Sequence, residues 1–69
     1  MIKILINGKL IELPHALTLA ELLKQNGISA NDKGIAVAYN DEVVMKSHWE
    51  KLRVQDGDRL EIVRATQGG

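Results

Sequence analysis

The first fourteen residues combine a strand-like run with one fully apolar face and an Asn-Gly pair, and this combination constrains the fold more than any other feature. Isoleucine occupies every second position of residues 2–6, which predicts a strand with one apolar face. Asn7-Gly8 is typical of a type I′ turn, because both central residues of that turn need positive φ. The return strand should run from Lys9 to about Leu13, since Pro14 limits further pairing. The chain therefore begins with a β-hairpin that needs an apolar layer on one face.

A short helix is expected after the hairpin, with signals at both of its ends. Thr18 and Glu21 have the spacing of a capping box, in which each side chain accepts a hydrogen bond from the other residue's backbone. Gly27 is suited to end a helix, and Ile28 can supply the apolar contact that follows such an end. The sequence predicts a helix from Leu19 to Asn26.

Three more strands are expected in the second half of the chain. Larger side chains alternate with alanines in residues 35–39, and turn-forming residues separate this strand from a short one at 42–45. Residues 46–55 lack clean periodicity, so we expect a turn or short 3₁₀ stretch packed over the edge of the core. Asp56-Gly57-Asp58 predicts a tight turn before the last strand, at residues 59–64.

The order of these elements is strand, strand, helix and then three strands, which is the order of the β-grasp fold. We therefore predict an α+β domain in which a mixed sheet of about five strands packs on one helix. The first and last strands are the most apolar, so they should lie side by side at the centre of the sheet. Alternation assigns to the helix-covered face Ile2, Ile4, Ile6, Leu60 and Ile62.

Length and charge narrow the class of protein. A chain of 69 residues forms one small domain, which buries only about 60% of the surface of its unfolded chain. We expect residues 1–64 to form the domain and residues 65–69 a flexible tail. Nine basic residues balance nine acidic ones, so no electrostatic footprint for nucleic acid or an anionic membrane appears. Membrane-spanning and signal-peptide patterns are also missing, which favours a cytoplasmic protein.

The side chains inside the domain give little evidence for a catalytic or metal site. Cysteine is absent, which removes disulfides, thiolate metal sites and cysteine nucleophiles. His15 and His48 have no patterned carboxylate partner, so we predict no metal site. Asp56 and Asp58 are better explained as turn residues than as a catalytic pair. Trp49 is expected in the core, with an exposed docking role as the alternative.

The distinctive chemistry of the sequence lies at its C-terminal Gly68-Gly69. Glycine has no Cβ, so such an end can enter a channel too narrow for other residues. It suits an enzyme that must reach a main-chain carboxylate and derivatise it. The alternative is a frayed end or a cloning remnant. Because apolar alternation stops after Arg64, we expect the tail to be mobile.

Several segments of the chain together resemble one known family. They are residues 35–44 with the pattern Asn40-x-Glu42-x-Val44, then Trp49, residues 56–63 and the tail. These residues resemble the ThiS family, the ubiquitin-like sulfur carrier proteins of thiamin biosynthesis, and the resemblance covers the whole chain. Many members end in three glycines or Ala-Gly-Gly, whereas Gln67 precedes the glycine pair here.

The resemblance implies a carrier rather than an enzyme. A ThiF-like adenylating enzyme would use ATP to activate the carboxylate of Gly69, while Gly68 threads the channel of that enzyme. Sulfur from a cysteine desulfurase or a rhodanese-type donor would then replace AMP and give a thiocarboxylate. A ThiG-like thiazole synthase would take this sulfur. We expect no bound cofactor or metal, and no nucleic acid or membrane as a partner.

Three alternatives stay open at this point. A molybdopterin-synthase small subunit would share the thiocarboxylate but deliver sulfur to a pterin precursor. A ubiquitin-like modifier would instead form an isopeptide bond with lysine. The third alternative is a non-reactive β-grasp interaction module that ends by chance in two glycines.

The sheet face away from the helix is the expected docking surface. Alternation places Leu5 and Val63 there on the two central strands, and we predict that they neighbour each other with Lys3 and Glu61 beside them. Two adjacent apolar residues on a solvent face form a docking patch rimmed by charge. We therefore expect Leu5 and Val63, with Gln67 of the tail, to contact the partners. The alternative is that Leu5 and Val63 only satisfy β-propensity or pack under a loop.

Overall fold

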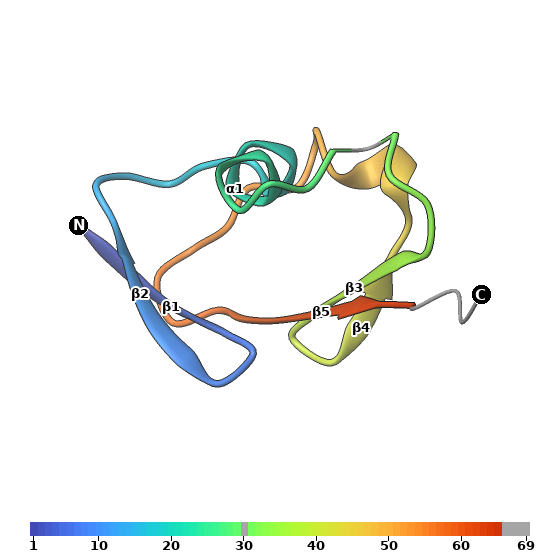
Figure 1. Ribbon diagram of the computed structural model, residues 1–69. Coiled ribbons are helices and arrows are strands. Elements are labelled where there is room, and N and C mark those ends of the chain that lie inside the picture. Colours follow the sequence, from blue (N-terminus) through green and yellow to red (C-terminus); the bar gives the residue numbers. More distant parts are fainter. Residues whose placement is uncertain (30, 66–69) are drawn as a thin grey trace.

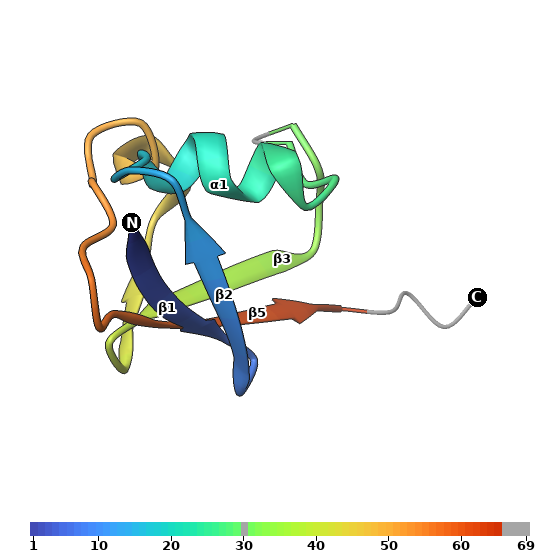
Figure 2. The same cartoon turned by 90° about the vertical axis from the view of Figure 1, so that its left-hand side faces the viewer.

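The computed structural model describes residues 1–29 and 31–65, in which a helix packs on one face of a five-stranded sheet (Figures 1 and 2). The elements in chain order are β1 (Ile2–Ile6), β2 (Lys9–Leu13), α1 (Leu19–Gln25), β3 (Ile35–Tyr39), β4 (Glu42–Val44), the 3₁₀ helix η1 (Lys46–His48) and β5 (Arg59–Arg64). The strand order is β2-β1-β5-β3-β4, with β1 and β5 parallel and the other neighbours antiparallel. The predicted mixed sheet with its first and last strands side by side is confirmed.

Both hairpins use two-residue turns with positive φ at each central residue. Asn7 and Gly8 have φ of 51° and 80°, and Asn40 and Asp41 have φ of 49° and 73°. These signs are those of the type I′ turn, whose twist matches the twist of the flanking strands. Asn and Asp tolerate this region better than other residues that carry a Cβ. The predicted turns are confirmed, and they fix which residues of each hairpin face the helix.

The start of α1 is closed by its own cap and by the segment that follows η1. The predicted capping box is present: Thr18 N–H donates to Glu21 Oε1 at 2.9 Å, and Glu21 N–H donates to Thr18 Oγ1 at 3.2 Å. The next free N–H groups, of Leu19 and Ala20, donate to the carbonyls of Leu52 and Trp49 at 2.8 and 2.9 Å. Residues 49–52 therefore satisfy backbone donors that a helix start leaves unpaired.

The end of α1 is a Schellman motif built on Gly27. Ile28 N–H donates to Leu23 O at 2.9 Å, and Gly27 N–H donates to Lys24 O at 3.0 Å. Gly27 has a φ of 78°, and Ile28 is buried against the core. The predicted helix runs one residue too far, because Asn26 is the C-cap.

In residues 1–29 and 31–65 no helix has the length and apolar character needed to cross a membrane.

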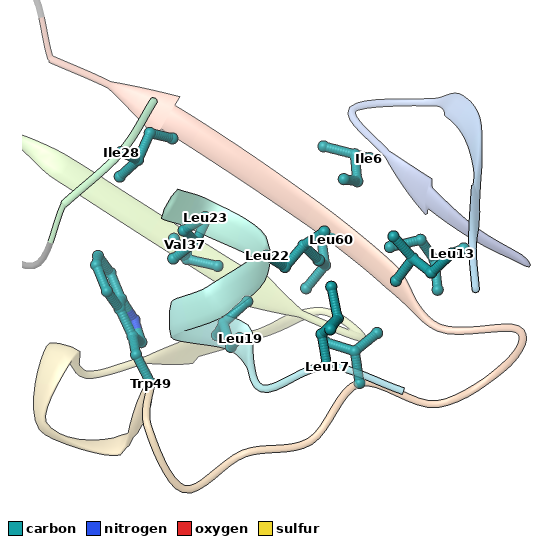
Figure 3. Close-up of a cluster of buried hydrophobic side chains, with 12 residues drawn as sticks. Ile6, Leu13, Leu17, Leu19, Leu22, Leu23, Ile28, Val37, Trp49 and Leu60 are labelled. Atoms are coloured by element: carbon teal, nitrogen blue, oxygen red, sulfur yellow. The ribbon is translucent and has the colours of Figure 1, made fainter. Parts of the chain in front are cut away.

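The core lies between α1 and the sheet and is closed at one side by Trp49. Figure 3 shows Leu22 and Leu23 of the helix directed toward Leu60 and Val37 of the sheet. Trp49 is 1% exposed, and its Nε1 donates to Val44 O at 3.3 Å. Its predicted structural role is confirmed, and this burial rules out the alternative of an exposed docking residue. The five isoleucine and leucine residues predicted for this face are buried or partly buried there.

The turn before β5 is attached to β1 through backbone and carboxylate groups. Asp56 Oδ1 accepts the N–H of Lys3 at 2.6 Å, and Gly57 N–H donates to Lys3 O at 2.7 Å. Leu5 N–H then donates to Asp58 O at 3.0 Å, which continues the contact toward the paired strands. The predicted role of Asp56-Gly57-Asp58 as a turn is confirmed. The hydrogen bonds of this turn to Lys3 and Leu5 align β5 with β1.

Candidate functional site

The predicted reactive end of the chain lies outside the described residues. Gln67, Gly68 and Gly69 belong to this part, as does the predicted mobile tail from residue 66 onward; of that predicted tail, the structure describes Ala65 alone. The structure does describe the approach to it: β5 ends at Arg64 and points away from the N-terminus (Figure 2). Ala65 follows, and its N–H donates to Gly34 O at 2.6 Å. The chain is therefore attached to the sheet as far as Ala65.

The outer face of the sheet is open in the part of the chain that the structure describes. Figure 1 shows α1 and η1 on the same side of the sheet, with no described element on the opposite side. Leu5 is 36% exposed and Val63 is 59% exposed on this open face. The predicted assignment of both residues to the outer face is confirmed. Their contact with partners stays a prediction.

The predicted contact between Leu5 and Val63 is wrong. Leu5 pairs with Arg59 across β1 and β5, while Val63 pairs with Ala36 of β3. Val63 stands four residues beyond Arg59, which corresponds to about 13 Å along an extended strand. The physical reason is that β1 ends at Ile6, opposite Leu60, and turns away before it reaches the level of Val63. The outer face therefore has two separate apolar areas.

The first area is the Leu5–Leu10 patch, formed by these two cross-strand neighbours. Leu5 pairs directly with Leu10, which is 61% exposed on the edge strand β2. A shallow depression of about 270 Å³ adjoins the pair and is lined also by Lys3 and residues 56–58. This patch lies beside Arg59, the first residue of β5, whereas the tail follows the last residue of that strand.

The second area is the Val43–Val63 patch, which spans β5, β3 and β4. Val63 pairs with Ala36, and Ala38 pairs with Val43, which is 77% exposed. Ala38 also pairs with Glu61, so Val43 is level with Glu61, and the two valines stand diagonally across β3 with the small side chains of the two alanines between them. Because Val63 is two residues before Ala65, this patch adjoins the start of the tail. Of the two apolar areas, it is the one closer to the predicted reaction site.

Charged residues separate the two patches. Arg59 and Glu61 of β5 line a depression of about 250 Å³, together with Leu5 and Ala38. The Nη2 atom of Arg59 lies 2.8 Å from Asp41 Oδ2, and both side chains are exposed. An exposed pair of this kind contributes little to stability, so breaking it to contact a partner would cost the fold little. Glu61 was predicted beside the docking residues, and its place between the patches agrees with a charged rim.

Asp58 and Tyr39 form a hydrogen-bonded pair beneath the turn at Asn40. Tyr39 Oη donates to Asp58 Oδ2, Gln55 N–H donates to the same oxygen at 2.7 Å, and Asn40 Nδ2 donates to Oδ1 at 3.2 Å. Burial alone would raise the pKa of Asp58, but these three hydrogen bonds outweigh it and lower the pKa. Burial, and then the bond to Asp58 and its charge, raise the pKa of Tyr39 to about 12. Near neutral pH, Asp58 is therefore ionised and Tyr39 keeps its phenolic proton, as the hydrogen bond between them requires.

The remaining polar candidates show no catalytic arrangement among the described residues. His15 and His48 are exposed, and His15 Nδ1 lies 3.1 Å from the carbonyl of Ala16. Residues 1–29 and 31–65 hold no group of three or more histidine, aspartate or glutamate side chains that could bind a metal. The distinctive features that the structure describes are therefore the open sheet face and the attachment of Ala65.

Comparison with known proteins identifies the family. Residues 4–69 match the sequence profile of the ThiS family. The chain belongs to the ThiS family. A crystal structure of the thiamine biosynthesis protein ThiS from Geobacter metallireducens superimposes with a TM-score of 0.81 at 27% identity, covering 99% of this chain and 100% of that one. The predicted β-grasp fold and the predicted family are both confirmed.

Two curated relatives extend this ThiS comparison. The sulfur carrier protein ThiS of Escherichia coli is 31% identical over 67 residues, which are 97% of this chain and 98% of that protein. A thiazole synthase of Paramagnetospirillum magneticum is 37% identical over 67 residues, again 97% of this chain. This chain spans only 20% of the length of that synthase. A ThiS-like sequence therefore occurs both as nearly an entire protein and as one part of a longer protein.

Proposed function

We propose that this ThiS-family chain carries sulfur as a thiocarboxylate on Gly69 and delivers it for thiazole formation. The general function follows from the family: the chain is a sulfur carrier protein of thiamin biosynthesis. One observation supports the finer proposal most strongly. The family match continues to residue 69, so Gly68-Gly69 belongs to the matched region. A diglycine end is what a narrow adenylation channel requires, because neither residue carries a Cβ.

The chemistry begins with a group that is unreactive by itself. A carboxylate resists nucleophilic attack because its negative charge repels the nucleophile and an oxide is a poor leaving group. Attack of the Gly69 carboxylate on the α-phosphorus of ATP would form an acyl-adenylate and release pyrophosphate. Sulfur at the oxidation level of hydrosulfide would then attack the acyl carbon and expel AMP, which leaves the thiocarboxylate at Gly69 with no change of oxidation state. ATP is a substrate of the activating partner and not a ligand of this chain, and its use fits the predicted cytoplasmic location.

A thiazole synthase is the acceptor that the relatives favour. In the P. magneticum protein of that name, a stretch similar to this chain is part of the same polypeptide. Covalent linkage raises the effective concentration of a carrier near its acceptor, to the millimolar range for a short flexible linker. Such an arrangement is useful when carrier and synthase meet directly. For the adenylating enzyme and the sulfur donor, the proposal rests on the resemblance to the ThiF-type system.

The Val43–Val63 patch is the surface that we assign to partner docking first. Residues 66–69 can reach at most about 14 Å from Ala65 even when fully extended. An active site that receives Gly69 must therefore lie close to the end of β5, where Val63 of the Val43–Val63 patch is located. The Leu5–Leu10 patch lies further along the same open face and would contact a partner large enough to cover the sheet.

Pyrophosphate exchange tests the proposal directly. A ThiF-type adenylating enzyme, labelled pyrophosphate and the wild-type chain should give rapid incorporation of label into ATP. Deletion of Gly69, or addition of a residue after it, should abolish exchange, and Gly68→Val should reduce it strongly. Thermal unfolding of all variants should match that of the wild type, since these positions follow the last strand. Normal exchange by the chain without Gly69 would contradict the proposal.

A further inference from the structure

The contact between Gly34 and Ala65 extends the sheet to the start of the tail. Ile35 pairs with Arg64 as the last register pair of β3 and β5. One residue further along each strand, Ala65 N–H donates to Gly34 O at 2.6 Å. Ala65 is thus held by a backbone hydrogen bond outside the named strands, at the point where the chain leaves the domain.

Gly34 permits this contact because of its positive φ and because it has no Cβ. Its φ is 73°, in the left-handed region that disfavours residues with a Cβ. A Cβ built on Gly34 would lie 3.3 Å from the carbonyl oxygen of Ala65 and 3.4 Å from the Cβ of Ala65. The glycines at positions 8, 27 and 57 also have positive φ, but a Cβ there would meet no atom within 4 Å. Gly34 differs from them because another segment of the chain packs directly against its Cα.

We propose that Gly34 is a positioning residue for sulfur loading, which holds Ala65 against β3 so that residues 66–69 leave the domain from a fixed point. This inference rests on the proposed function of Gly69. Fixing the backbone of one residue costs a factor of roughly 5 to 30 in an equilibrium constant. The backbone of Ala65 is already fixed in the folded domain, so this loss of conformational entropy does not occur again when the tail enters an active site. Gly34 itself touches neither the carboxylate nor ATP.

This role predicts a particular split in the kinetics of adenylation. The outer face of the sheet does not include Gly34, so docking of the domain on the activating enzyme should be unaffected by a change there. What should change is the fraction of docked complexes in which Gly69 reaches the active site. Loss of the Gly34–Ala65 contact should therefore lower kcat and leave the KM for the carrier nearly constant. A residue that acts only on stability would move neither constant while the domain stays folded.

The test compares Gly34→Ala with the matched control Gly27→Ala. Both substitutions place alanine at nearly the same positive φ, 73° and 78°, but only Gly34→Ala introduces a Cβ against Ala65. Amide hydrogen exchange should show a protected Ala65 N–H in the wild type and in Gly27→Ala, and a faster-exchanging one in Gly34→Ala. Pyrophosphate exchange with a ThiF-type enzyme should show a kcat that is about 5- to 30-fold lower for Gly34→Ala alone, the cost of ordering one more residue.

A second variant keeps the test decisive if Gly34→Ala fails to fold. Ala65→Pro removes the N–H that donates to Gly34 and leaves Gly34 unchanged, because proline has no amide hydrogen. It should lower kcat in the same way. Equal kcat for the wild type and a folded Gly34→Ala or Ala65→Pro, or an unprotected Ala65 amide in the wild type, would overturn the positioning role alone. A wild-type chain that the enzyme does not adenylate would overturn the proposed function and this role together.

Discussion

The carboxamide of Asn7 forms two hydrogen bonds with the backbone of Ile62. Asn7 Oδ1 accepts the N–H of Ile62 at 2.8 Å, and Asn7 Nδ2 donates to Ile62 O at 3.3 Å. The backbone N–H of Asn7 also donates to Leu60 O at 2.9 Å. β1 has already turned away at this level, so the side chain takes the place of the next strand residue. The parallel pairing of β1 with β5 is thereby extended by one side chain.

Replacing Asn7 by glycine should separate this role from the role of Asn7 in the turn. Asn7→Gly keeps the positive φ of 51° without strain but removes both bonds to Ile62. Two hydrogen bonds at about 0.5–1.5 kcal/mol each predict a loss of roughly 1–3 kcal/mol in the free energy of unfolding. Urea denaturation measures this loss. Asp41→Gly is the control, because it also relieves a positive φ but removes only an exposed ion pair. Equal stability of the two variants would contradict the role given to the Asn7 side chain.

The stability of the domain should fall between pH 10 and pH 12 because of Tyr39. The fold raises the pKa of Tyr39 from 10.0 to about 12, so the folded state holds the phenolic proton more tightly than the unfolded state does. The resulting stabilisation is complete below the unfolded pKa and is lost as the pH rises through the folded one. Tyr39 is the sole tyrosine, so ultraviolet absorbance reports its ionisation directly. Titration near pH 10 in the folded wild type would contradict the pair with Asp58.

Asp58 should contribute the opposite dependence at acid pH. Its pKa is lowered in the folded state, because the bonds from Tyr39, Gln55 and Asn40 outweigh the effect of burial. The stabilisation is therefore present above the ordinary carboxyl pKa and lost as the pH falls through the folded value. Asp58→Asn should be less stable than the wild type at neutral pH, and this difference should shrink on acidification. A constant difference across the acid range would show that the charge of Asp58 does not matter.

The two apolar patches should act independently in partner binding. Leu5→Asp and Val63→Asp should each weaken binding to the adenylating enzyme or the thiazole synthase by roughly fivefold or more, because each would bury an unpaired carboxylate in the interface. Effects at sites more than about 7–10 Å apart add, so the double variant should lose the product of the two single losses. Titration calorimetry with each partner measures this. Wild-type binding by both single variants would contradict the proposal that the open sheet face contacts partners. Unfolding of either variant would show that its side chain belongs to the core.

Much of the fold could be predicted because its signals are local. Thr18 and Glu21 stand three residues apart, and the Asn-Gly and Asn-Asp pairs specify their own turns. Alternation also assigned Leu5 and Val63 to the correct face. It could not give their separation, because a period of two fixes the face but not the register between β1 and β5. That register depends on where β1 stops and on the Asp56-Gly57 contact with Lys3.

The contacts of Asn7 and Gly34 escaped prediction for a related reason. Asn7 has a complete local explanation in its turn, so nothing in the sequence points to Ile62, 55 residues away. Gly34 stands in a polar loop where glycine is unremarkable, and its closeness to Ala65 arises only when β3 and β5 pair. Both residues serve the strand that leads to the tail. A glycine or asparagine next to a strand end is the one signal that could have directed attention to them.

Intact mass of the chain purified from cells with an active thiamin pathway tests the central claim most directly. The account predicts a species heavier by the difference between one sulfur and one oxygen atom, with fragmentation assigning the increment to Gly69. The increment should disappear when Gly69 is deleted or when the cells lack the ThiF-type enzyme. A chain that shows only the unmodified mass while it supports thiazole formation, or an increment at a residue other than Gly69, would contradict the claim that Gly69 carries the sulfur.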